Sequence, residues 1–137
     1  MYTHHVHYYE TDKMGITHHS NYIRWMEEAR TDYLAKIGWP YDRLEAAGLI
    51  SPTVSVDVKY KKTTTYADTV NIDVTIEEYK GLKIVFSYKM MKEDGSIACE
   101  AQSSHCFIDE NGRPLKVAKV NPELDESITS HIGVHVD

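Results

Sequence analysis

The sequence predicts an α+β domain in which one long helix packs against an antiparallel β-sheet. The spacing of the apolar residues carries this prediction. Between residues 20 and 38 apolar side chains recur every three or four positions, as on one face of a helix. After Pro52 they alternate every second position, as on one face of a strand. A helix that covers one face of such a sheet encloses one core between two layers.

The first part of the chain is expected to hold one strand and two helices. Tyr2–Glu10 mixes β-branched, aromatic and histidine residues, which is typical of a strand. The long helix follows, with Ser20 or Asn21 as its N-cap, and it ends before Pro40. A short second helix is expected at Tyr41–Ala47. The apolar face of the long helix consists of Tyr22, Trp25, Met26, Ala29, Tyr33 and Ile37.

Four strands are expected to follow Pro52 and to pair in chain order as an antiparallel meander. Glycine-containing turns at Lys80-Gly81 and Glu93-Asp94-Gly95 separate three of them. A terminal helix is expected at Asn121–Ser130, and the last seven residues are expected to be loose. The four strands are Val54–Val58, Val70–Ile76, Leu82–Met90 and Ile97–Ile108.

Length and composition indicate one soluble globular domain that spans residues 1–137. No apolar run approaches the roughly 20 residues that a membrane span needs. The first residues lack the basic start and apolar stretch of a signal peptide, so we expect a cytoplasmic protein. The net charge of −6 argues against nucleic-acid binding. Cys99 and Cys106 lie an odd number of positions apart in one expected strand, so we expect them to be free thiols.

The segment from Tyr9 to Tyr22 carries the most chemistry. Asp12 lies in a loop that contains Gly15, and a helix begins just beyond this loop. The first turn of a helix presents unpaired backbone N–H groups and about half a positive charge. Such a turn can polarise a thioester carbonyl and hold the oxyanion that forms when the carbonyl is attacked. A carboxylate beside it can act as a nucleophile or activate a water molecule.

The same segment contains the motif Tyr-x-Glu/Asp-x-Asp-x-x-Gly-x-x-x-His/Tyr-x-Asn-Tyr, which is matched by Tyr8, Glu10, Asp12, Gly15, His19, Asn21 and Tyr22. By this motif the segment resembles the 4-hydroxybenzoyl-CoA thioesterase-like group of hotdog proteins. Arg24–Arg30 resembles the central helix of that family, and the likeness extends through residues 50–60 to Asp109–Pro114. The resemblance implies the hotdog fold, in which an antiparallel sheet wraps around one long central helix.

The same resemblance implies an acyl-CoA thioesterase, which hydrolyses a thioester to CoA and a carboxylic acid. Asp12 then takes the catalytic position as nucleophile or general base, and the backbone N–H near His19 polarises the carbonyl. No metal and no separate cofactor are implied, because CoA is part of the substrate. The family also implies a homodimer or a dimer of dimers (a homotetramer) with sites at the subunit interface. An exposed apolar edge strand independently favours pairing with a second copy.

Several further residues of the chain are expected to contact the substrate. Tyr22 and Trp25 belong mainly to the apolar helix face, but they are candidates to touch the acyl group. Lys59 and Lys61 are candidates to bind the phosphates of CoA, which favour cations. Alternatively, these lysines only keep a strand edge soluble and discourage its pairing with other strands. The expected substrate-binding set is Gly15, His18, Asn21, Tyr22, Trp25, Lys59 and Lys61.

Other interpretations of these residues remain open. Asp12 could instead be an ordinary turn residue without a catalytic role. In a second alternative, Glu27 or Glu28 on the helix supplies the catalytic carboxylate. A non-catalytic acyl-CoA or acyl-carrier-protein binding module and a hotdog hydratase or dehydratase are the competing functions. A metal site is disfavoured, because neither a cysteine pair nor a His-Glu-x-x-His motif accompanies the histidines. The histidines weighed for it are His4, His5, His7, His18 and His19.

Overall fold

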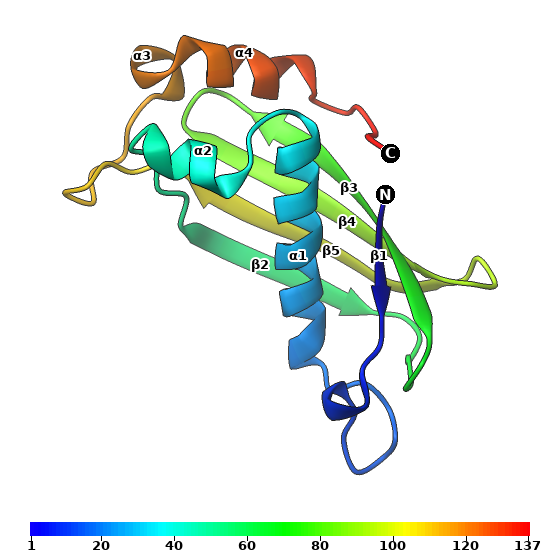
Figure 1. Cartoon of the computed structure of the whole chain (residues 1–137). Coiled ribbons are helices and arrows are strands. Elements are labelled where there is room, and N and C mark those ends of the chain that lie inside the picture. Colours follow the sequence, from blue (N-terminus) through cyan, green and yellow to red (C-terminus); the bar gives the residue numbers. More distant parts are fainter.

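A five-stranded antiparallel sheet and a long helix across its face form most of the molecule, whose computed structural model describes residues 1–137 (Figure 1). The expected α+β arrangement is confirmed. The helices are η1 (Tyr8–Glu10, a 3₁₀ turn), α1 (Ser20–Lys36), α2 (Tyr41–Ala46), α3 (Val117–Val120) and α4 (Pro122–Ser130). The strands are β1 (Tyr2–His5), β2 (Thr53–Tyr60), β3 (Thr69–Tyr79), β4 (Lys83–Lys92) and β5 (Ile97–Cys106).

The strand order differs from the expected meander. The sheet runs β1-β3-β4-β5-β2, so β2 pairs with β5 and not with β3, which follows it in the chain. Val56 lies opposite Ser103 and Val58 opposite Ala101. The connection between β2 and β3 spans residues 61–68, longer than the 2–5 residues typical of a hairpin. This length lets the chain pass from one edge region of the sheet to the other.

The first strand is shorter than expected. It ends at His5, and the chain then turns through η1 at Tyr8–Glu10. The side chain of Glu10 stabilises this turn, because its carboxylate folds back and accepts a hydrogen bond from the backbone N of His7 at 2.8 Å. A local side-chain bond of this kind competes with the pairing of a strand.

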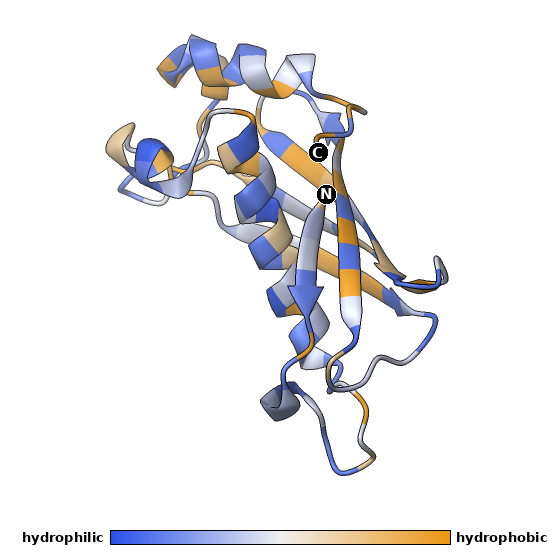
Figure 2. Ribbon diagram, turned by 45° about the vertical axis from the view of Figure 1, so that its right-hand side comes forward, coloured by the Kyte–Doolittle hydropathy of each residue, from blue (hydrophilic) through white to orange (hydrophobic).

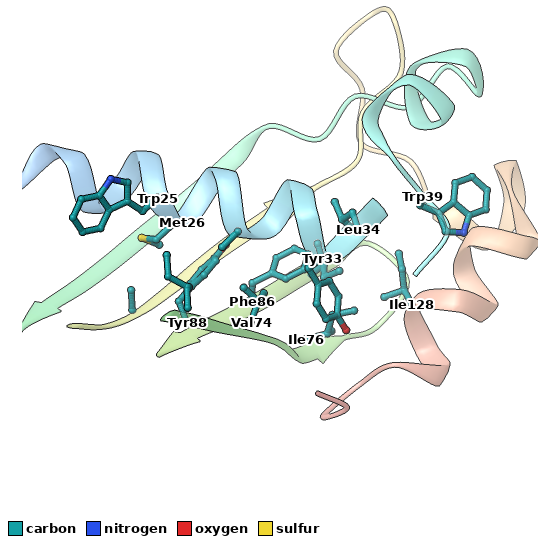
Figure 3. Close-up of a cluster of buried hydrophobic side chains, with 14 of the residues drawn as sticks. Trp25, Met26, Tyr33, Leu34, Trp39, Val74, Ile76, Phe86, Tyr88 and Ile128 are labelled. Atoms are coloured by element: carbon teal, nitrogen blue, oxygen red, sulfur yellow. The ribbon is translucent and has the colours of Figure 1, made fainter. Parts of the chain in front are cut away.

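The core lies between α1 and the inner face of β3, β4 and β5. Polar and apolar residues alternate along β3, and its apolar residues are the buried ones (Figure 2). The predicted face of α1 is confirmed, since five of its six residues are buried and Ile37 packs against them half-buried. Figure 3 shows Met26 and Tyr33 of α1 lying over Phe86 and Tyr88 of the sheet. Each large apolar side chain buried in this way contributes roughly 1.5–3 kcal/mol.

The helix leaves β2 largely uncovered. Val54, Val56 and Tyr60 on this strand are 60%, 41% and 48% exposed. One edge of β2 pairs with β5, and no other strand pairs with its second edge. The molecule therefore presents an edge strand with exposed apolar side chains.

The end of the chain is attached to the sheet, in contrast to the loose tail that was expected. The backbone N of Gly133 donates to the carbonyl of Ile76 at 2.8 Å, and His135 lies 2.8 Å from Asp73. The two chain ends also meet, because the N-terminal ammonium donates to the carbonyl of Val136 at 2.8 Å (Figure 1). The two cysteines are free thiols, as predicted. None of the helices combines the length and apolar character that a membrane crossing requires.

Candidate active site

Asp12 lies on a narrow loop that directly precedes α1. Thr11 and Thr17 form an antiparallel bridge across its base, and the backbone N of Asp12 donates to the carbonyl of Ile16 at 2.9 Å. Gly15 adopts a φ of +77°, in a region that other residues rarely occupy. Its N–H donates to the carbonyl of Asp12 at 2.9 Å. Gly15 thus has a conformational role, because it lets the loop reverse.

A second loop, residues 61–68, holds this first loop in place. The backbone N of Thr17 donates to the carbonyl of Thr64 at 2.8 Å, and their hydroxyl oxygens lie 2.6 Å apart. The hydroxyl of Tyr22 lies 3.0 Å from that of Thr64, and the hydroxyl of Thr65 donates to the carbonyl of Gly15 at 2.7 Å. Thr64 is almost fully buried. These contacts fix the loop of Asp12 against both α1 and the connection between β2 and β3.

The carboxylate of Asp12 is half-buried at the surface of its loop. One oxygen accepts a hydrogen bond from the backbone N of Met14 at 2.8 Å, and the second has no partner within the chain. Asp109 makes the same contact, since it accepts from the backbone N of Asn111 at 2.9 Å. The contact with Met14 alone therefore does not separate a catalytic carboxylate from a turn residue.

The start of α1 presents one unpaired backbone donor. The N–H of His18 donates to the carbonyl of Glu10 at 2.8 Å, and that of Ser20 faces the Nδ1 atom of His18 at 3.3 Å. The N–H of Asn21 donates to the carbonyl of His18 at 3.0 Å. The N–H of His19 has no hydrogen-bond partner within the chain. Because it precedes the first turn of α1, it adds to the positive end of the helix dipole.

A pocket of about 210 Å³ opens beside this helix start. His19, Tyr22 and Lys61 line it, and the hydroxyl of Tyr60 donates to the carbonyl of His19 at 3.1 Å. The ring of Tyr60 also stands edge-on to that of Tyr22, with 5.1 Å between centroids. The pocket therefore combines an unpaired N–H, aromatic walls and a nearby lysine. These features suit a ligand with a polar group that accepts a hydrogen bond and a negatively charged extension. Asp12 is not part of the lining formed by a single chain.

A family model described as the thioesterase-like superfamily matches residues 6–128. The chain belongs to this family. A Bacillus subtilis protein provisionally described as an acyl-CoA thioesterase is 38% identical over 119 residues, which cover 86% of each chain. The 4-hydroxybenzoyl-CoA thioesterase of a Pseudomonas species is 24% identical over 124 residues, which cover 85% of this chain and 88% of that one.

The solved structure of a DHNA-CoA thioesterase from Staphylococcus aureus superposes with a TM-score of 0.91 at 32% identity, and covers 94% of this chain and 87% of that one. The predicted family of hotdog acyl-CoA thioesterases is therefore confirmed. The sequence identity and the structural similarity to these proteins place the chain among the thioester hydrolases.

In this member of the thioesterase family, the fold brings together part of the predicted site. Gly15, His18 and His19 lie with Asp12 on one loop, and Tyr22 and Lys61 reach the pocket beside it. Two other predicted residues are buried within the helix packing. Asn21 donates from Nδ2 to the carbonyl of Glu10 at 2.9 Å. Trp25 is 0% exposed.

Lys59 lies elsewhere in the thioesterase fold. It points into a groove of about 400 Å³ on the outer face of the sheet, away from α1. Asp57, Asp73, Glu100 and a second lysine, Lys89, share this groove, so charges of both signs line it. Within one chain, Lys59 and the pocket at the start of α1 are separate features.

Two helix carboxylates were weighed as alternatives to Asp12. Glu27 and Glu28 are exposed and line a groove with Tyr2 and His4 on another side of α1. An oxygen of Glu28 accepts a hydrogen bond from the hydroxyl of Tyr2 at 3.2 Å. Neither residue lines the pocket at the start of α1.

The structure brings together only some of the histidines that were weighed for a metal site. Ligand atoms of His4, His7 and Glu10 lie within 4.8 Å of one another. His5 contacts Thr69 instead, at 3.1 Å. The carboxylate of Glu10 is already engaged by three N–H donors, so hydrogen bonding accounts for this cluster. A site without a metal stays a prediction.

The sequence interpretation gave no role to Tyr60, Thr64 or Glu10. Tyr60 and Thr64 act through contacts between distant segments, and nothing in their local sequence signals those contacts. Glu10 was noted as a motif position only. An acidic residue within an otherwise aromatic and β-branched segment was the available signal, because a carboxylate there needs partners if it is buried.

Proposed function

We propose that this thioester hydrolase acts on an acyl-CoA, with Asp12 as nucleophile or general base and the backbone N–H of His19 as the group that polarises the carbonyl. The observation that supports it most is the shared loop. One rigid loop carries a carboxylate oxygen without a partner and, before the first turn of α1, an N–H without a partner. These are the two groups that hydrolysis of a thioester requires.

The chemistry follows from these two groups. The carbonyl oxygen of the thioester accepts a hydrogen bond from the N–H of His19, which stabilises the negative charge that develops on that oxygen. One such donor contributes roughly 100- to 1000-fold in rate. In the nucleophilic route, Asp12 attacks the carbonyl carbon and the CoA thiolate leaves. Water then hydrolyses the mixed anhydride to the acid and restores Asp12.

In the general-base route, Asp12 removes a proton from a water molecule as this water attacks the carbonyl carbon. The tetrahedral intermediate collapses, the carbon–sulfur bond breaks, and the thiolate receives the proton. Both routes give the same products and need the same placement of the carboxylate. They differ in whether a covalent anhydride between the acyl group and Asp12 forms before water enters.

The CoA moiety extends from the pocket past cationic side chains. Lys61 and Lys62 line the pocket beside His19 and Tyr22. Ammonium groups suit the phosphates of CoA, because charge-assisted hydrogen bonds to phosphate are the stronger ones. The role of Lys59 in this capture also remains a proposal, and it requires CoA to approach the outer face of the sheet.

A second copy of the chain completes the site in this proposal. The pocket of a single chain does not include Asp12, and β2 presents a free edge with exposed valines. Pairing of two copies along β2 would cover this edge. We therefore propose a homodimer, or a dimer of dimers, whose interface lies beside the acyl group.

The proposed function is tested with the purified protein and a panel of aliphatic and aromatic acyl-CoAs and acyl-carrier-protein thioesters. We expect release of free thiol from at least one acyl-CoA, unchanged by treatment with a chelator. Calorimetric titration with CoA measures binding in parallel. Binding of CoA without turnover of any thioester would replace the hydrolase with a binding module, and loss of turnover on chelation would contradict the metal-free mechanism.

A further inference from the structure

A buried carboxylate lies next to the catalytic loop and takes no part in the proposed reaction. Glu10 is 4% exposed. One of its oxygens accepts hydrogen bonds from the backbone N of His7 and from Nε2 of His4, both at 2.8 Å. The other accepts from Nε1 of Trp25 at 2.7 Å. The carboxylate thus joins β1, η1 and α1 at one point.

The charged form of Glu10 suits this environment. Burial alone raises the pKa of a carboxyl group, but the hydrogen bonds from His7, His4 and Trp25 outweigh burial and hold the pKa of Glu10 below its ordinary value. An ionised carboxylate in the interior needs such donors, because burial without them costs several kcal/mol. The three N–H donors in turn need the carboxylate, because it is the acceptor of their hydrogen bonds.

The backbone of Glu10 closes the loop that carries Asp12. Its carbonyl accepts hydrogen bonds from the backbone N of His18 at 2.8 Å and from Nδ2 of Asn21 at 2.9 Å. The loop leaves Glu10 at Thr11 and returns to it at His18. Both ends of the loop are therefore fixed to the same residue, and so is the first turn of α1.

We propose that Glu10 is a positioning residue that sets Asp12 relative to the N-terminus of α1. The inference rests on the proposed function, because it names what holds the catalytic carboxylate and the N–H of His19 in a common frame. The side chain fixes Glu10 to α1 through Trp25, and the backbone fixes the loop to Glu10. A shift of about 1 Å at a reacting group can cost up to 100-fold in rate.

A glutamine at position 10 cannot reproduce these contacts. Its amide group has one oxygen and one NH₂ group, whereas both carboxylate oxygens of Glu10 accept hydrogen bonds. If the amide oxygen faces His7, the NH₂ group meets the N–H of Trp25, and the reverse orientation opposes it to the N–H of His7. His4 can adapt by changing its tautomer. One buried donor is left without an acceptor in either orientation.

The test compares Glu10→Gln with Glu28→Gln as a matched control. Glu28 also faces His4, with 3.5 Å between an oxygen and Nδ1, but its side chain is 44% exposed and it does not touch the loop. We expect Glu10→Gln to lower kcat at least about tenfold, with a much smaller change in KM, because chemistry needs the exact placement more than binding does. Glu28→Gln is expected to keep the wild-type values.

Two further measurements keep the inference falsifiable. Trp25→Phe removes the indole N–H that reaches Glu10 and also makes the buried ring smaller, and it is expected to lower kcat in the same direction if Glu10→Gln does not fold. Hydrogen exchange at the amide of His18 is expected to accelerate in both variants, which tests the anchor without any substrate. If kcat and exchange both stay at wild-type values, Glu10 is not a positioning residue, even when Asp12 proves essential. If wild type hydrolyses no thioester, the proposed function fails instead.

Discussion

At the scale of single residues, the buried histidine on β5 is expected to make the free energy of unfolding depend on pH. His105 is 1% exposed and lies 2.7 Å from the hydroxyl of Ser103. The hydroxyl of Ser103 lies 2.6 Å from that of Tyr88, to which Arg30 donates at 3.1 Å. Burial, together with the positive charge of Arg30, lowers the pKa of His105 to about 4. The imidazole is therefore neutral in the folded protein near neutral pH.

This lowered pKa predicts a loss of stability on mild acidification. The unfolded chain takes up a proton at His105 as the pH falls through about 6.5, whereas the folded chain does so only near 4. The free energy of unfolding is expected to fall by about 1 kcal/mol per pH unit between these values. The pKa of Glu10 is lowered from 4.5, so the stability that its ionised carboxylate contributes is lost only below that pH. Urea unfolding at pH 5–7 measures the effect.

The variant His105→Gln is expected to flatten this dependence, and His5→Gln, which changes an exposed histidine, is expected to preserve it. Equal slopes in wild type and His105→Gln would show that His105 is not the group responsible.

The residue scale is also where sequence reasoning is weakest. It placed Asp12 and Gly15 together on a loop before a helix, and the structure has this loop. It included Trp25 in the substrate-binding set, whereas the indole is buried and donates to Glu10. Which side chains share a contact depends on the packing of segments far apart in the chain, and spacing along one segment does not contain this information.

At the scale of elements, α1 is held by the apolar residues that its spacing predicted. Met26 is 1% exposed in the core. Met26→Ala removes most of this side chain and leaves a cavity, so it is expected to lower the free energy of unfolding by about 2–5 kcal/mol. Leu82→Ala, at a residue that is 40% exposed, is the control and is expected to cost under about 1 kcal/mol. Denaturant unfolding compares the two, and equal losses would contradict the assigned core.

The elements themselves were predicted well and their pairing was not. The long helix, the four later strands and the two hairpin turns follow from periodicity and glycine positions within short windows. The pairing of β2 with β5 joins segments that are far apart in sequence. Alternation within β2 gives its two faces but not its neighbour. The length of residues 61–68 was the one local sign that β2 and β3 do not form a hairpin.

At the scale of the whole molecule, the exposed face of β2 predicts self-association. Val56 is 41% exposed on the edge strand, and a lysine there would place a charge in an interface formed along β2. Val56→Lys is expected to convert a dimer into a monomer and to lower turnover with it, because the proposed site lies at that interface. Val120→Lys, at a residue of α3 that is 50% exposed, is the matched control. Sedimentation equilibrium measures the assembly, and a wild type that is monomeric and fully active would contradict the proposal.

The central claim is that Asp12 performs the hydrolysis, and the kcat of Asp12→Asn for the best acyl-CoA tests it most directly. Asp109→Asn is the matched control, because Asp109 makes the same turn contacts: its carboxylate accepts from the backbone N two residues on, and its carbonyl accepts from Gly112 at 3.0 Å. Asparagine preserves the turn and removes the charge. We predict that Asp12→Asn lowers kcat about 100- to 10,000-fold with CoA binding retained, while Asp109→Asn stays near wild type. Equal turnover by both variants would contradict the account.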